Sequence, residues 1–195
     1  MSVRPKILAF AGSTREASFN KRLVKLAMES ASRAGGDVTY LDLRDIPLPL
    51  FDEDLEASAG PPENARKLKA ALLSHDALLI SSPEYNSSIS AVLKNAIDWA
   101  SRPAAGEASL ACFEGKVAGL LSTSPGALGG LRGLVHLRSI LGNIRVLVLP
   151  DQVAVPKAHE AFGPDGRLKD AKVQSSVDKL CERLVSVAAR LRPGP

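Results

Sequence analysis

The chain has few cysteines, no long apolar run and no recognisable leader, and each of these absences excludes a class of protein. Its 195 residues include two cysteines, Cys112 and Cys181, which are too few and too isolated for a disulfide framework or a metal site. No window approaches the roughly 18 consecutive apolar residues of a membrane-spanning helix. The amino terminus runs directly into a short predicted strand, without the segments of a secretory leader. We therefore expect a cytoplasmic protein with no membrane span.

Clusters of positive charge and of aromatic side chains are also missing. The formal net charge is +4 and the isoelectric point is about 9.2, but lysine and arginine are scattered among acidic residues. The chain has two tyrosines and one tryptophan. These features argue against a nucleic-acid-binding stripe. A mildly positive field would still attract a polyanionic substrate such as a reduced nicotinamide dinucleotide.

Common nucleotide-binding and catalytic motifs are absent as well. The chain has no Gly-Lys-Ser/Thr of a P-loop and no G-x-G-x-x-G, which disfavours a nucleoside triphosphatase or a Rossmann dehydrogenase. It has no G-x-S-x-G nucleophile elbow, so no serine stands out as an acyl-transfer nucleophile. His75, His136 and His159 are far apart and lack the spacing of metal ligands. We therefore predict no metal site and no catalytic side chain.

What the sequence does contain is an alternation of apolar runs and helical patterns. With 45% hydrophobic and 24% charged residues, the chain 1–195 suits one globular domain that buries roughly 70% of its unfolded surface. The predicted strands are Lys6–Ala11, Val38–Leu43, Ala77–Ser81, Lys116–Ser122 and Arg145–Leu149. The predicted helices are Asn20–Ala34, Pro62–Ser74, Ile89–Ala100, Gly130–Leu141 and Leu168–Leu191.

The character of the strands indicates how they are arranged. The first, third and fourth are almost wholly apolar, which is typical of parallel strands covered by helices on both faces. Alternating strand and helix units then predict a doubly wound α/β sheet. Polar loops follow strands 1 and 3, which suits the flavodoxin-like order 2-1-3-4-5 of five parallel strands, with its ligand crevice between those two strands.

The loop after the first strand is rich in anion-binding groups. Residues 12–20 read Gly-Ser-Thr-Arg-Glu-Ala-Ser-Phe-Asn and lead into a helix. Hydroxyl, guanidinium and amide donors there meet the positive end of a helix dipole, which predicts a phosphate site. The candidate binding residues are Gly12, Ser13, Arg15, Ser18, Phe19 and Asn20. The alternative is a tight turn in which Ser18 only caps the helix.

The third strand ends abruptly in Ser-Pro-Glu-Tyr-Asn-Ser-Ser, residues 82–88. Consecutive backbone amides there would form a polar edge for a flavin ring, where donors stabilise the negative charge that develops on two-electron reduction. The candidate residues are Pro83, Glu84, Tyr85, Asn86 and Ser87. The alternative for Tyr85 is an ordinary half-buried position at the sheet edge.

A third loop, residues 122–130, follows the fourth strand and is again rich in hydroxyls and glycine. We expect it to reach the same crevice, with Ser124 and Gly126 as candidate binding residues. Taken alone, the pattern also fits a simple turn.

Together these residues identify a family resemblance. Gly12-Ser13-Thr14-Arg15 with Ser18 and Asn20, then Pro83-Glu84-Tyr85-Asn86, then Leu93-Lys94-Asn95-Ala96-Ile97-Asp98-Trp99 resemble the NADPH-dependent FMN reductase family. Within it, the sequence is most similar to bacterial quinone, chromate and azo-dye reductases. The resemblance implies non-covalent FMN, hydride transfer from NADPH or NADH to the flavin, and two-electron reduction of a small acceptor such as a quinone, an azo dye, chromate or free flavin. It also implies a homodimer or homotetramer.

The resemblance assigns the candidate residues. The first loop would hold the FMN phosphate, residues 83–86 would line the ring, and Ser124 and Gly126 would approach the ring from the fourth strand. The chain departs from the family where many members have an aromatic residue at Ser87 and Pro-Gly at Ser90-Ala91. The smaller Ser87 would widen the pocket, so the acceptor preference of the family does not carry over to this chain.

Two rival functions remain open. One is a flavodoxin-type single-electron carrier, although the strong acidity typical of such carriers is missing. The other is a flavin-free domain that binds a phosphorylated metabolite or a partner protein.

Two long connections complete the predictions. We expect Arg44–Pro61 to lie over a surface groove or a partner subunit, and Ser101–Gly115 to be a flexible loop. Trp99 and the apolar flank of its helix are predicted to face a second subunit.

Overall fold

A five-stranded parallel sheet forms the centre of the computed structural model, which describes residues 4–104 and 106–191. Its strand order is β2-β1-β3-β6-β7, which is the predicted flavodoxin-like order with the strands renumbered. The strands are β1 (Lys6–Ala11), β2 (Asp37–Leu41), β3 (Ala77–Ser81), β6 (Val117–Thr123) and β7 (Leu147–Val155). The residues of β3 and β6 are buried throughout, because helices cover both faces of the sheet.

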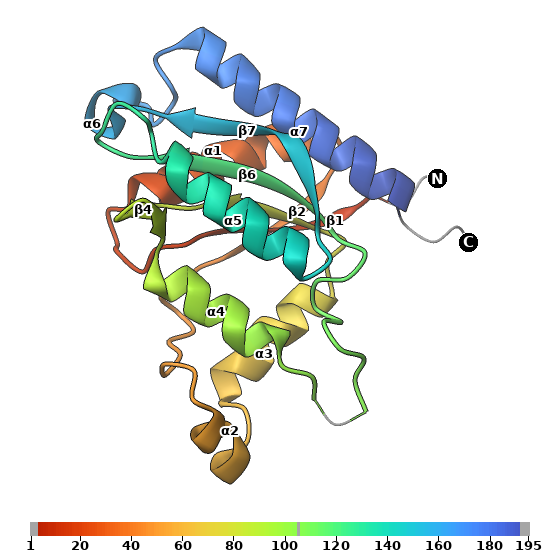
Figure 1. The fold of residues 1–195 in the computed structure, drawn as a ribbon. Helices are drawn as coiled ribbons and strands as arrows, with labels where there is room; N and C mark the ends of the chain where they lie inside the picture. The colour runs from red at the N-terminus through yellow and green to blue at the C-terminus, as the bar shows by residue number, and fades with distance from the viewer. Residues whose placement is uncertain (1–3, 105, 192–195) are drawn as a thin grey trace.

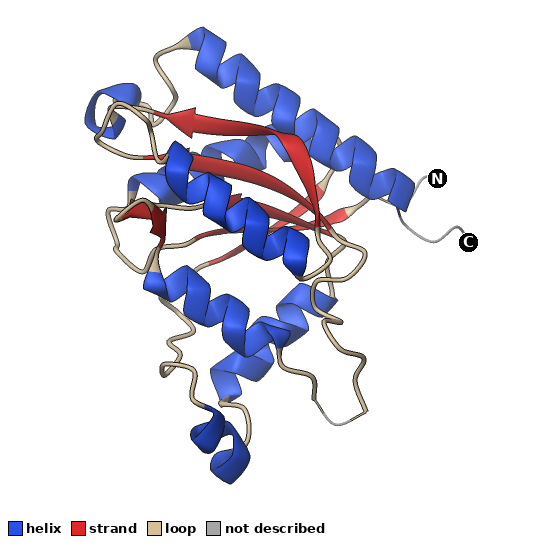
Figure 2. Cartoon of the chain, viewed as in Figure 1, coloured by secondary structure: helices blue, strands red, loops and turns tan. Residues whose placement is uncertain are grey.

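Two layers of helices enclose the sheet, as Figures 1 and 2 show. On one face lie α1 (Phe19–Arg33) and α7 (Ala171–Leu191), whose apolar stripes pack against one core cluster. On the other lie α3 (Glu63–Leu73), α4 (Ala91–Ser101) and α5 (Leu131–Asn143), which pack against a second. No helix among the described residues is long and apolar enough to cross a membrane.

The differences from the predicted elements are local. Strand β7 continues to Val155 through an irregular stretch around Pro150, which an edge strand tolerates because one of its edges needs no ladder hydrogen bonds. Helix α7 begins at Ala171 because Leu168 forms a bridge to Phe162 instead. The short elements α2 (Glu53–Ala59), α6 (Ala158–Ala161), β4 (Glu84–Tyr85) and β5 (Ser88–Ile89) were not predicted.

The connection from residue 44 to 61 lies against α4 of the same chain. The Pro49 carbonyl accepts hydrogen bonds from Trp99 Nε1 and Asn95 Nδ2, each at 2.8 Å, and the Phe51 ring meets the Trp99 ring edge-on at 5.0 Å between centroids. Only 1% of Trp99 is exposed. The prediction that Trp99 faces a second subunit is therefore wrong, since its own chain covers it.

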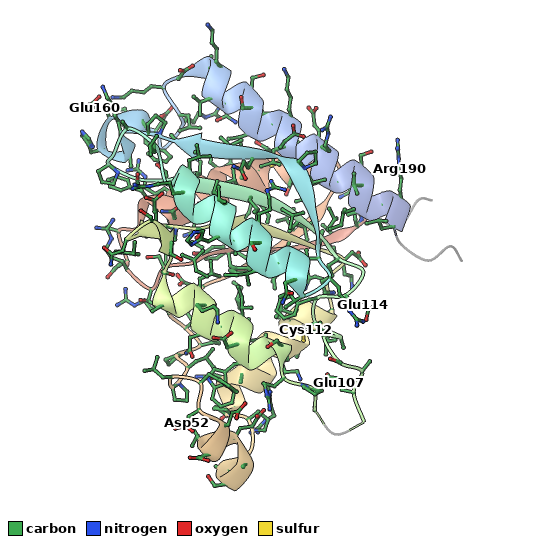
Figure 3. The ribbon with its side chains drawn as sticks, in the orientation of Figure 1. Asp52, Glu107, Cys112, Glu114, Glu160 and Arg190 are labelled. Carbon is green, nitrogen blue, oxygen red and sulfur yellow. The ribbon has the colours of Figure 1, made fainter. Side chains whose placement is uncertain are left out.

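The connection from residue 101 to 115 is anchored at two places along its described residues, which leave out residue 105. Glu107 pairs with the buried ammonium of Lys69 at 2.5 Å. Cys112 and Phe113 are buried in the second core cluster. Figure 3 labels Glu107 and Cys112 on this connection, between α4 and β6. The expected flexible loop is therefore held to the body of the molecule.

Candidate functional site at the carboxyl edge of the sheet

The three predicted loops meet at the carboxyl ends of the parallel strands. Gly12 N–H donates to the Ser81 carbonyl at 3.0 Å, which ties the first loop (residues 12–18) to the end of β3. The Ser90 hydroxyl donates to the Gly12 carbonyl at 2.6 Å, and the Ser122 hydroxyl donates to the Ser82 carbonyl at 2.6 Å. The ends of β1, β3 and β6 therefore form one connected edge, where open α/β sheets bind their ligands.

In the first loop, Ser18 is the N-cap of α1, and its hydroxyl accepts from Lys21 N–H at 3.4 Å. Ser18 therefore caps the helix, but the cap does not use up the donors of the helix terminus, so capping and anion binding are compatible. The N–H groups of Phe19 and Asn20 lie in the first turn and have no intrahelical acceptor. They remain available to an anion at the positive end of the helix.

Ser13 and Arg15 lie just before this helix terminus. The buried Ser13 hydroxyl accepts from Arg15 N–H at 3.3 Å. The exposed Arg15 guanidinium donates to the Ala17 carbonyl at 3.0 Å and lies 5.7 Å from the centre of the Phe19 ring. Because a guanidinium carries five N–H donors, Arg15 keeps several for a ligand.

Asn20 is buried, and its side chain is bonded to the protein. Its Nδ2 donates to the Thr123 carbonyl at 2.9 Å, while its Oδ1 accepts from the Ser81 hydroxyl at 2.8 Å and from Thr123 N–H at 3.1 Å. The structure therefore shows Asn20 joining α1 to the ends of β3 and β6. Nothing in the local sequence indicates this role, because its partners lie 61 and 103 residues away.

The segment after β3 forms a hairpin (residues 84–89), in which β4 pairs with β5. Its two turn residues, Asn86 and Ser87, have φ of 50° and 65°, as a type I′ turn requires. Tyr85 pairs with Ser88 and is 60% exposed. The sequence predicted a turn here but not a hairpin, because serine is a poor signal for positive φ.

Glu84 turns its carboxylate toward the start of α5. One oxygen accepts from Arg132 N–H at 3.1 Å and Gly133 N–H at 3.2 Å, and the other from the Arg132 guanidinium at 2.6 and 2.9 Å. Burial opposes ionisation, but these hydrogen bonds and the charge of Arg132 outweigh it and lower the pKa of Glu84. The carboxylate is therefore ionised and fully engaged within the protein.

Two glycines allow the third loop (residues 124–130) to lie close to its neighbours. Gly130 has φ of 89°, and an added Cβ would fall 1.8 Å from the Ser122 hydroxyl. At Gly129, with φ of 62°, an added Cβ would fall 2.6 Å from the Val155 backbone. Ser124 N–H donates to the Val155 carbonyl at 3.3 Å. The predicted residues Ser124 and Gly126 thus lie on a loop that is fixed to the end of β7.

One ion pair beside the first loop was not predicted. The buried Lys21 ammonium lies 2.7 Å from Asp42, just beyond β2. Burial disfavours the ionised carboxylate of Asp42, but hydrogen bonds from Lys21 and from Arg44 N–H outweigh this effect and lower the pKa of Asp42. Burial first, and then the charge of Asp42, raise the pKa of Tyr40 to about 12. The cluster of Lys21, Asp42 and Tyr40 stabilises the first turn of α1.

The donor set decides which kind of ligand fits this edge. The first loop offers a guanidinium, hydroxyls and free helix-terminal N–H groups, which suit a phosphate. The hairpin and the third loop offer mostly backbone N–H and carbonyl groups, and the Glu84 carboxylate near them is already paired with Arg132. The described residues contain no group of three or more histidine, cysteine, aspartate or glutamate side chains able to hold a metal ion. FMN, with a phosphate at one end and a polar ring at the other, fits this set.

The sequence profile of the NADPH-dependent FMN reductases matches residues 5–160. The chain belongs to this family. The NADPH-dependent FMN reductases are oxidoreductases, and the matched region includes all three loops. FMN and NAD(P)H are therefore the cofactor and co-substrate that membership of this family indicates.

Individual members of the NADPH-dependent FMN reductase family agree with this assignment. An NAD(P)H-dependent FMN reductase of Pseudomonas aeruginosa is 36% identical over 193 residues, covering 98% of this chain and 100% of the relative. A 2-hydroxy-1,4-benzoquinone reductase of a Burkholderia species is 39% identical over 145 residues, 74% of each chain. The solved structure of FerB, an NAD(P)H:(acceptor) oxidoreductase of Paracoccus denitrificans, superposes with a TM-score of 0.80 at 28% identity, covering 95% of this chain and 98% of that chain.

Proposed function

We propose that the protein is an FMN-dependent NAD(P)H:quinone oxidoreductase. The observation that carries the proposal is the meeting of three loops at one sheet edge, with anion donors at one end and a backbone-rich hairpin at the other. The Burkholderia relative that reduces a benzoquinone supports a quinone as the acceptor. Bound FMN would accept a hydride from NAD(P)H and pass two electrons to the acceptor.

The protein's part in this reaction is to bind and to orient. Ser13, Arg15, Ser18 and the N–H groups of Phe19 and Asn20 would hold the phosphate. Pro83, Glu84, Tyr85, Asn86 and Ser87 would face the ring mainly through their backbone, with Ser124 and Gly126 approaching it from the end of β6. N–H groups aimed at the ring's N1–C2=O edge would stabilise negative charge there. Hydride transfer requires no protein acid or base, and we assign none.

The cellular location and the oligomeric state of the protein are also part of the proposal. We propose a cytoplasmic location, supported by two free, buried cysteines. A homodimer or homotetramer remains part of the proposal and is tested by sedimentation at micromolar protein.

An anaerobic titration of the FMN-loaded protein with NADPH tests the proposal. Bleaching of the flavin spectrum by one equivalent of NADPH, followed by recovery on adding a benzoquinone, is the expected result. Absence of bleaching despite bound flavin would favour a single-electron carrier, and absence of flavin uptake would favour a flavin-free domain. Turnover with free FMN, an azo dye or chromate in place of the quinone ranks the possible acceptors.

The phosphate end is tested with Arg15→Ala. We expect FMN affinity to fall by roughly tenfold, the value of one charge-assisted hydrogen bond, while riboflavin affinity is unchanged because riboflavin lacks the phosphate. Arg22→Ala is the matched control, since it also removes a positive charge near the start of α1, and the Arg22 guanidinium stacks on Phe162, 4.6 Å from the ring centre. Equal FMN affinity in both variants would remove Arg15 from the site.

A further inference from the structure

The hairpin cannot hold its own shape. Each of its strands, β4 and β5, has two residues, and an isolated two-stranded hairpin is marginal in water even when it is longer. Its turn also holds Ser87 at a φ of 65°, which is unfavourable for serine, although Asn86 tolerates its φ of 50°. Its conformation must therefore be imposed by contacts with the rest of the protein.

Those contacts come chiefly from Glu84. Its carboxylate receives four hydrogen bonds, two from backbone N–H groups of the first turn of α5 and two from the Arg132 guanidinium. A second contact joins the Ser88 hydroxyl to His136 Nδ1 at 3.0 Å, one turn further along the helix. The hairpin is thus fixed to α5 at two points, and the stronger one is ionic.

The two charges of this contact differ in their surroundings. The Glu84 side chain is 9% exposed, whereas the Arg132 side chain is 58% exposed. A buried carboxylate acts on its neighbours through a low local dielectric, and an unpaired one would oppose further negative charge nearby. Arg132 and the positive end of α5 neutralise it here.

We propose that Glu84 and Arg132 are a charge-balanced positioning pair that fixes the hairpin and sets the preference of the site for reduced over oxidised flavin. The inference rests on the proposed function, in which the hairpin faces the ring. Glu84 holds the hairpin in place, and Arg132 keeps the Glu84 charge from opposing the negative charge that develops on the ring during reduction. Neither residue is assigned a step in the chemistry.

The test is the flavin midpoint potential in a double-mutant cycle, measured by equilibration with a redox dye. Glu84→Gln leaves Arg132 unopposed and should strengthen binding of reduced relative to oxidised flavin by roughly threefold to tenfold. Arg132→Met leaves the Glu84 carboxylate with its two backbone N–H donors from α5 but without its cation, and it should weaken binding of reduced relative to oxidised flavin by a similar factor. A tenfold change in that ratio corresponds to about 30 mV for a two-electron couple. The double variant should return close to the wild-type potential.

Two further variants separate charge from structure. Arg132→Lys keeps the charge and loses the planar fork, so it should restore most of the wild-type potential. Arg138→Met removes a positive charge from the same helix, where Arg138 contacts Gln152 at 3.2 Å and does not touch the hairpin, so the potential should stay unchanged. If Glu84→Gln fails to fold, the three arginine variants still decide the matter.

The outcomes are distinguishable from failure of the proposed function. Wild-type protein that binds no FMN would refute the proposed function itself. Wild-type protein that binds FMN, with Glu84→Gln and Arg132→Met shifting the potential in the same direction, would overturn the pair's electrostatic role. The same conclusion would follow if Arg132→Met matched Arg138→Met, or if Arg132→Lys matched Arg132→Met.

Discussion

The first loop and the hairpin lie side by side at the same sheet edge, yet they are held in different ways. The buried attachments of the first loop are uncharged hydrogen bonds, from Ser90 to the Gly12 carbonyl and around the Asn20 amide, whereas its ion pair, between Glu16 and Arg44 at 3.1 Å, is exposed. The hairpin is fixed through an ionised carboxylate and a guanidinium. Neutral buried contacts are insensitive to salt and pH, whereas partly exposed ionic ones respond to both.

The difference suits what each part is proposed to do. A phosphate brings its own charge, so the loop that receives it needs free donors and gains nothing from a fixed carboxylate nearby. A ring edge that becomes negative only on reduction needs a backbone held in one position, with nearby charges in balance. Single substitutions that remove one contact at a time test this difference between the first loop and the hairpin.

The largest effect is expected at Gly130, on the side of the hairpin. Gly130→Ala places a Cβ 1.8 Å from the Ser122 hydroxyl at a φ of 89°, so we expect the free energy of unfolding to fall by about 2–4 kcal/mol. Gly142→Ala is the control, because an added Cβ there meets nothing within 4 Å. That change should stabilise α5 by about 0.5–1 kcal/mol. Urea unfolding of the apoprotein measures both, and equal stabilities would contradict the close contact.

The next effect is expected at Asn20, on the side of the first loop. Asn20→Ala removes three hydrogen bonds and leaves buried groups of Thr123 and Ser81 without partners, so the free energy of unfolding should fall by about 2–3 kcal/mol. FMN affinity should fall with it, because the start of α1 loses its attachment. The exposed Asn143→Ala is the control and should change neither quantity. A fall in affinity without loss of stability would make Asn20 a direct ligand instead.

Asn20 and the hairpin show how much of the fold and of the candidate site could be predicted from the sequence. The strand order was predictable because apolar runs report local burial, and the polar donors of the first loop could be read directly from its composition. The attachment of Asn20 to strands 61 and 103 residues away was not, because no local pattern encodes a long-range hydrogen bond. The hairpin escapes prediction for a related reason, since Ser87 gives no local signal for its φ of 65° and the Glu84 carboxylate finds its partners in α5, 48 and 49 residues away.

Trp99 shows a different kind of error, in which the segment that covers a side chain is not the one predicted. A large aromatic residue on a helix flank predicts a subunit interface, but the segment around Pro49 and Phe51 covers Trp99. Sequence patterns indicate that a side chain needs burial without identifying what buries it.

A smaller effect is expected at Ser90, which links the two parts. Its hydroxyl accepts from Leu93 N–H at 3.1 Å as the N-cap of α4 and donates to the Gly12 carbonyl at 2.6 Å. Ser90→Ala should lower the free energy of unfolding by about 1–2 kcal/mol. Ser90→Thr keeps the hydroxyl and should recover most of it. If Ser90→Ala also lowers FMN affinity while riboflavin affinity falls equally, the link serves the whole site and not the phosphate end alone.

The smallest effect tests the contrast between neutral and ionic contacts directly. Because the folded-state pKa of Glu84 lies below its ordinary value of 4.5, the carboxylate stabilises the fold above that pH, and this stabilisation is lost as the pH falls through the folded-state pKa. Near pH 7, Glu84→Gln should therefore cost about 1 kcal/mol, a modest value since Arg132 is 58% exposed.

The two parts should then diverge under changed conditions. The stability difference between wild type and Glu84→Gln should shrink below a pH of about 4.5 and in about 1 M salt, where the screening length is roughly 3 Å. The difference between wild type and Asn20→Ala should stay constant, because that contact carries no charge. Urea unfolding of the apoproteins over a range of pH and salt concentration measures both stability differences. Parallel behaviour of the two variants would mean that the hairpin is held mainly by the backbone N–H groups of α5 and by Ser88, with the guanidinium contributing little.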